Sequence, residues 1–202
     1  KEYLYVSDNV TSAFLSPTGV SIVAPSLSTV AVFHKGRFYF YENGIFNSSV
    51  PLTPEVVDVN LSVDFLPYDN YGKAFYAVDF CGFVYVVSEG GIYRFTEVSD
   101  RRIRVEKIIK FAVKIKEGSA VVVGKYLYFI TDDGVYKLNG NSVELVDEPS
   151  KFGYALSGVI AGACCENYYV KNDFNEVVAY VGGRNSFTRV FGVEVNRCGV
   201  FK

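Results

Sequence analysis

Short runs of aromatic and β-branched residues, each pair of runs separated by a tight-turn signal, recur along the whole chain. Such runs favour strands of a pleated sheet. Two runs around a turn predict a β-hairpin, and five segments have this form. They are Tyr3–Phe14, Arg37–Phe46, Phe83–Phe95, Lys125–Leu138 and Asn167–Tyr180. No segment long enough for a helix shows an apolar period of 3.6 residues, so the pattern predicts an all-β chain.

Three of these hairpins carry a marked turn signal. The pairs are Asn43-Gly44, Gly90-Gly91 and Asp133-Gly134. Asparagine, aspartate and glycine tolerate the positive φ angles that two-residue hairpin turns require. We therefore expect the chain to reverse at these three pairs.

The hairpins belong to a longer repeat. Their central tyrosines are separated by 46, 43 and 41 residues and are Tyr39, Tyr85, Tyr128 and Tyr169. A short apolar strand and a tight corner precede each of these four hairpins. The corners are His34-Lys35-Gly36, Phe80-Cys81-Gly82, Val122-Val123-Gly124 and Cys164-Cys165-Glu166. One further strand follows the hairpin, as in Ile103–Ile109 and Ser142–Val146, which makes four strands per unit of about 40 residues.

A four-stranded repeat of this length resembles the blades of β-propellers across nearly the whole chain. The resemblance implies a small five-bladed β-propeller that occupies residues 1–202 as a single domain. The sequence lacks the Trp-Asp dipeptides of WD40 blades, the kelch glycine pattern and the Asp-box of sialidases, so it indicates no functional subfamily. A pair of β-sandwiches is the alternative fold.

The two ends of the chain predict how a ring would close. The first copy, from Tyr3, has no leading strand, whereas Val190–Phe201 looks like a leading strand with its corner. In that segment Cys198-Gly199 matches Cys81-Gly82. We expect the C-terminal strand to complete the N-terminal blade, which removes exposed sheet edges.

Small residues recur at one register of the leading strands, four residues before the aligned corner. They are Ala31, Ala77, Ser119 and Ala161, and we expect them to face a narrow axis and to be almost fully buried. Glu194 takes this place in the last strand; a register shift of one residue would instead turn it outward. Asp79 lies on the same face as Ala77, so Asp79 and Glu194 form a candidate channel pair. A hydrogen-bonded structural role is the alternative for Asp79.

The longest connection between strands, Val63–Lys73, contains the candidate contact loop. Tyr68, Asp69, Asn70 and Tyr71 cluster there beside proline and glycine. Tyrosine with small polar neighbours is typical of adaptable contact surfaces. The alternative is an ordinary connection whose tyrosines fold onto the sheet.

Composition and motifs exclude several classes of function. A formal net charge of −2 offers no field for nucleic acid, and no apolar run is long enough for membrane insertion. The single histidine, His34, makes a catalytic triad a weak hypothesis, and the four cysteines show no zinc-ligand spacing. The sequence therefore predicts no metal and no cofactor. A Cys165–Cys198 disulfide is the alternative to free cysteines that fill a repeated niche.

We expect a non-enzymatic structural or protein-interaction module whose partner is another protein or a second copy of itself. Three sequons, at Asn9, Asn47 and Asn60, and the absence of methionine in a chain beginning at Lys1 favour a processed product or fragment. They favour an extracellular, cell-surface or virion location, and the absence of methionine also fits a thermophilic source. A carbohydrate-binding propeller and a glycoside hydrolase with carboxylates at the channel mouth are the alternatives.

Overall fold

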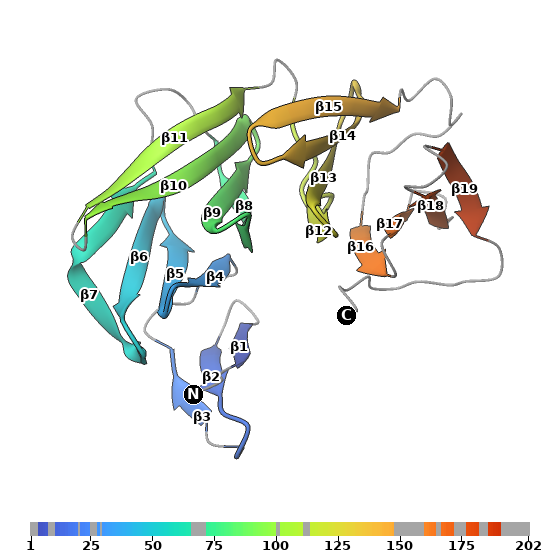
Figure 1. Ribbon diagram of the computed structural model, residues 1–202. Coiled ribbons are helices and arrows are strands. Elements are labelled where there is room, and N and C mark those ends of the chain that lie inside the picture. Colours follow the sequence, from blue (N-terminus) through green and yellow to red (C-terminus); the bar gives the residue numbers. More distant parts are fainter. Residues whose placement is uncertain are drawn as a thin grey trace. The chain divides into compact units, whose positions relative to one another are not determined.

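The computed structural model shows sheets of antiparallel strands and, in the residues it describes, no helix (Figure 1). The described residues are 4–7, 11–19, 21–24, 28, 30–65, 72–99, 102–110, 114–147, 160–164, 167–171, 177–181 and 186–190. They fall into two compact units, residues 1–88 with 92–108 and residues 89–91 with 109–202. The all-β prediction is therefore confirmed, and each unit is described by itself.

Sheets 1, 2 and 3 make up most of the first unit. Sheet 1 has the order β1 (Leu4–Ser7), β2 (Ser12–Leu15), β3 (Ser21–Val23). Sheet 2 has the order β4 (Ala31–His34), β5 (Arg37–Glu42), β6 (Ile45–Val50), β7 (Thr53–Asp64). Sheet 3 has the order β8 (Ala74–Phe80), β9 (Phe83–Ser88), β10 (Gly91–Ser99), β11 (Arg102–Lys110). In each sheet the strands follow chain order, as expected for a meander.

Sheets 4 and 5 belong to the second unit and repeat the same meander. Sheet 4 has the order β12 (Val121–Val123), β13 (Tyr126–Thr131), β14 (Gly134–Asn139), β15 (Ser142–Asp147). Sheet 5 has the order β16 (Ile160–Cys164), β17 (Asn167–Lys171), β18 (Val177–Val181), β19 (Ser186–Val190). The predicted unit of four strands is thus observed in four sheets of the described chain.

Turn chemistry explains where the chain reverses. Asn43 and Gly44 both have positive φ angles, 50° and 86°, as a two-residue hairpin turn requires. The other two predicted turns are wrong by one residue, because Glu89–Gly90 and Asp132–Asp133 form them instead. Gly134 pairs with Thr131 as the first residue of β14.

Within each unit the apolar core lies between neighbouring sheets, and in sheets 2, 3 and 4 the second strand is buried on both faces. In β5, β9 and β13 consecutive residues are buried, which places apolar side chains on both faces of the strand. Phe14 of sheet 1 packs with Phe38 and Phe40 of sheet 2. Tyr39 and Phe46 of sheet 2 belong to a cluster that continues into sheet 3. In the second unit, Tyr128 and Tyr168 stack with ring centroids 5.1 Å apart.

The predicted row of small residues is corrected at its third member. In sheet 4 Val123 pairs with Tyr126, so the two-residue turn is Gly124–Lys125 and the corner lies one residue later than expected. Ala120, which is buried, therefore replaces Ser119 at the register of Ala31 and Ala77. A slip of one residue reverses the face of every side chain in a strand.

The burial expected for this row is also wrong for two members. Ala31 and Ala77 are only partly buried; each lies beside one of the apolar clusters between sheets. Ser119 is fully buried but lies ahead of β12. Its Oγ donates to the Lys116 carbonyl and accepts a hydrogen bond from the Ile130 amide. Ala161 holds the expected register in β16, opposite Val170.

Sheet 1 has three described strands, and β1 pairs on one side with β2. The first copy therefore lacks a leading strand among the described residues, as the sequence indicates. Val190, assigned to the closing segment, instead pairs with Val177 as the last residue of β19. Residues 191–202 lie outside the described residues, so closure by the C-terminal strand stays a prediction.

Candidate functional site

Two hairpin turns mark one end of sheets 2 and 3. Lys35 and Gly36 join β4 to β5, and Cys81 and Gly82 join β8 to β9. All four have positive φ angles between 46° and 81°. The β6–β7 turn reaches the same end, because the Leu52 amide donates to the Gly36 carbonyl at 2.8 Å. We call this region the turn-end surface; it comprises Phe33, Lys35, Leu52, Asp79 and Cys81.

A histidine and an aspartate link the leading strands of sheets 2 and 3 at this end. His34, the last residue of β4, lies on the same strand face as buried Val32, toward sheet 3. Its Nδ1 is 3.0 Å from Oδ2 of Asp79, the penultimate residue of β8. The His34 side chain is 6% exposed and that of Asp79 is 47% exposed. With Nδ1 protonated, the imidazole donates to the carboxylate and a buried donor is satisfied.

A second polar link between the same sheets ends on Glu97 of β10. The Lys35 ammonium is 3.3 Å from Glu97 Oε2, and the Tyr39 hydroxyl donates to Glu97 Oε1 at 3.3 Å. Burial and the neighbouring Glu97 carboxylate raise the pKa of Tyr39 above its ordinary value. Tyr39 therefore remains a hydrogen-bond donor throughout the neutral range.

Two large apolar side chains are exposed at this end of sheet 2. Phe33 is 49% exposed although its ring packs against Phe38, with centroids 4.9 Å apart. Leu52, at the tip of the β6–β7 turn, is 74% exposed. Lys35, between them in the chain, is held by its ion pair to Glu97. The surface thus combines exposed apolar groups with charged groups whose partners lie within the protein.

The same geometry limits the chemistry of the site. A general base must reach the proton that it removes, but the His34 imidazole is buried and one nitrogen binds Asp79. Cys81 is an exposed free thiol. Across the residues the structure describes, no three His, Cys, Asp or Glu side chains gather to hold a metal ion. The part of the chain that the structure describes holds no helix long and apolar enough to cross a bilayer.

The sequence-predicted site residues are only partly covered by the structure. Tyr68, Asp69, Asn70 and Tyr71 lie outside the described residues, as does Glu194. The pairing of Asp79 with Glu194 therefore stays a prediction. Asp79 itself occupies the predicted strand and binds His34.

Sequence reasoning missed Phe33 and Leu52. A usable signal exists for Phe33, which occupies the same register before its turn as Asp79 does in β8. Residues at the same register lie on the same face of their strands and at the same distance from the turn. The half exposure of the Asp79 side chain therefore predicts half exposure of Phe33. Leu52 carries no such signal, because apolar residues in turns are not distinguishable from core residues by type alone.

Solved structures share this fold at low sequence identity. The WD40 β-propeller domain of Doa1 has a TM-score of 0.59 and 12% identity, over 93% of this chain and 64% of that chain. Virginiamycin B lyase from Staphylococcus aureus, in a catalytically inactive form with quinupristin, has a TM-score of 0.64 and 10% identity. That match covers 97% of this chain and 72% of the lyase. The chain therefore has the β-propeller architecture.

A third similar structure is much longer than this chain. It is the extracellular domain of a B. thetaiotaomicron protein described as a hybrid two-component system, with a TM-score of 0.66 and 9% identity. The match covers 95% of this chain but only 26% of that domain. No family model and no curated protein matches the sequence. These likenesses establish the fold and not the activity.

Proposed function

We propose that the chain is a non-enzymatic interaction module of β-propeller architecture whose turn-end surface binds a protein partner. The observation that carries this proposal is the exposure of Phe33 and Leu52 at one end of sheet 2. Protein interfaces concentrate binding free energy in a few large side chains that become fully desolvated. Phe33 and Leu52 are the large apolar side chains that this end of the sheet offers to a partner.

The polar groups around these two residues favour binding over chemistry. Lys35 pairs with Glu97, and His34 pairs with Asp79. Groups that are already paired are held in place before a partner arrives, so less side-chain entropy is lost on binding. Protein interfaces combine apolar anchors with polar groups at their rim, and the exposed Lys35 is a polar group at this end of the sheet.

The proposal also includes a closed five-bladed ring and an extracellular or surface location for the protein. Five sheets, of which four have four strands, support five blades, with the C-terminal strand completing sheet 1. An extracellular or surface location is supported by the extracellular domain among the similar structures. The contact loop at Tyr68–Tyr71 remains a second candidate contact region in this proposal. This loop follows β7. The C-terminal end of β7 lies near the Asn43–Gly44 turn, because the Phe65 amide donates to the Gly44 carbonyl.

The proposal is tested by chemical cross-linking of the protein in its native source, followed by mass spectrometry of the cross-linked partner. Recombinant Phe33→Ala and Leu52→Ala variants are then compared with the wild type for binding to that purified partner. Val59→Ala is the matched control, because Val59 is an exposed apolar residue in the middle of β7, away from the turns at either end of the same sheet. We expect a loss of about 10-fold or more for each test variant, the size typical of a true anchor, and no change for the control. Unchanged affinity in both test variants would exclude this surface.

A further inference from the structure

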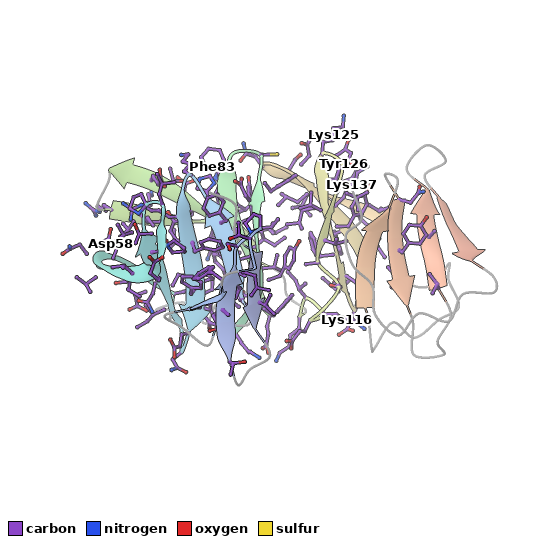
Figure 2. All side chains as sticks on the ribbon, turned by 90° about the horizontal axis from the view of Figure 1, so that it is seen from below. Asp58, Phe83, Lys116, Lys125, Tyr126 and Lys137 are labelled. Carbon is purple, nitrogen blue, oxygen red and sulfur yellow. The ribbon has the colours of Figure 1, made fainter. Side chains whose placement is uncertain are left out.

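We propose that Lys125, Tyr126 and Lys137 form a binding site for a compact oxyanion, the carboxylate or phosphate group of a ligand. Lys125 Nζ lies 5.4 Å from the centroid of the Tyr126 ring, and Lys137 Nζ lies 5.1 Å from the same centroid. Figure 2 shows the three side chains together at one end of sheet 4, with Lys116 at the opposite end. We call the three residues the lysine–tyrosine cluster.

One turn and two adjacent strands position this cluster. Lys125 belongs to the Gly124–Lys125 turn, and Tyr126 is the first residue of β13. Lys137 comes from β14, where it pairs with Tyr128. Because residues 126 and 128 share a face of β13, Lys137 lies on the Tyr126 face of the sheet. The Tyr126 and Tyr128 ring centroids are 6.2 Å apart and edge-to-face, a contact that helps to orient the Tyr126 ring that both lysines approach.

The charges of the cluster do not cancel. Lys137 Nζ is 3.2 Å from Glu144 Oε2, which leaves that lysine paired. Lys125 is exposed and, within the part of the chain that the structure describes, has no carboxylate partner. The cluster therefore carries an excess positive charge on a chain whose formal net charge is −2.

The arrangement favours an anion for two physical reasons. Two ammonium groups on one ring repel each other, and an anion that contacts both relieves this repulsion. Cation–π contacts also restrict two flexible side chains in advance, so less entropy is lost when an oxyanion binds. Lysine binds phosphate and carboxylate oxygens as a point charge, without the fixed two-pronged geometry of arginine. This site is independent of the turn-end surface, and its test does not require the protein partner.

The test is an NMR titration of the full chain at low ionic strength, which follows the lysine side-chain resonances. Inorganic phosphate and acetate are titrated separately, because the two arms distinguish a phosphate site from a carboxylate site. We expect saturable shifts of Lys125 and Lys137 with at least one of the two anions. Lys125→Met keeps most of the aliphatic stem over Tyr126 but removes the charge, and it should weaken binding at least five-fold.

Two further variants make the result decisive. Lys116→Met is the matched control, because Lys116 pairs with Asp132 at the other end of sheet 4 and its loss should leave binding unchanged. Glu144→Gln frees Lys137 and should strengthen binding at least two-fold. Circular dichroism confirms that each variant folds. Shifts that never saturate, or equal affinity in the wild type and Lys125→Met, would overturn the proposal.

Discussion

His34 Nδ1 lies 3.0 Å from Asp79 Oδ2, so a single hydrogen bond joins the last residue of β4 to the end of β8, the leading strand of the next sheet. The two partners have different surroundings, because the imidazole is buried and the carboxylate is about half exposed. Loss of the aspartate therefore leaves a buried polar group unpaired, whereas loss of the histidine leaves a carboxylate that water can solvate.

Asp79→Ala should lower the free energy of unfolding by about 1–3 kcal/mol, the usual cost of an unsatisfied buried donor. Asp79→Asn keeps an acceptor oxygen and should cost less. Urea denaturation of the two variants beside the wild type measures the difference. Equal stability of Asp79→Ala and the wild type would show that the hydrogen bond to His34 does not hold these sheets together.

The side-chain hydroxyls of Ser48 and Ser49, neighbours in β6, differ in their hydrogen bonding. The Ser49 hydroxyl accepts a hydrogen bond from the Phe38 amide at 3.0 Å, whereas the fully buried Ser48 hydroxyl has no partner among the described residues. Ser49→Ala should destabilise the protein by about 1–3 kcal/mol, and Ser48→Ala should be neutral or stabilising. Thermal unfolding compares the two variants directly, and the reverse order would contradict the β6 register.

The corrected register in sheet 4 predicts different effects at equivalent positions of sheets 3 and 4. Ala120→Leu should overpack a buried site and cost about 1–3 kcal/mol. Ala77→Leu should cost less, because Ala77 is only partly buried. Urea denaturation curves give both values. A neutral Ala120→Leu would contradict the alignment of the sheet 4 turn at Gly124–Lys125.

Closure of the ring predicts that residues 191–202 contribute to stability. Among the described residues β1 pairs with β2 alone, so a strand added at its other edge would give sheet 1 a fourth strand. Deletion of the last twelve residues should then lower the free energy of unfolding by several kcal/mol, an effect well above that of most single substitutions. A melting temperature that stays the same would contradict closure by this segment.

Much of the fold was predictable because the signals are local. Alternating aromatic and β-branched residues indicated the strands of all five hairpins, and Asn43-Gly44 indicated a turn that the structure contains. The errors also have a local cause. The turn in sheet 4 was predicted one residue too late because of Gly134. A glycine after two aspartates is compatible with the second turn position and with the first residue of the next strand, which Gly134 occupies.

The candidate site was less predictable because it depends on contacts between distant strands. The sequence placed Asp79 on its strand, but not beside His34, which is 45 residues earlier in the chain. Exposure of Phe33 and Leu52 depends on which ends of the sheets lie together, and residue type does not encode this. The same holds for Lys125 and Lys137, which lie in different strands and meet at one ring.

Hydroxyl-radical footprinting of the native complex tests the proposed interface most directly. Phenylalanine and leucine side chains react with the radical when exposed, so Phe33 and Leu52 report on the turn-end surface themselves. Val59, which is exposed in the middle of β7, serves as the internal reference. We predict that partner binding lowers the oxidation of Phe33 and Leu52 several-fold and leaves that of Val59 unchanged. Unchanged oxidation of Phe33 and Leu52 in the complex would contradict the proposal.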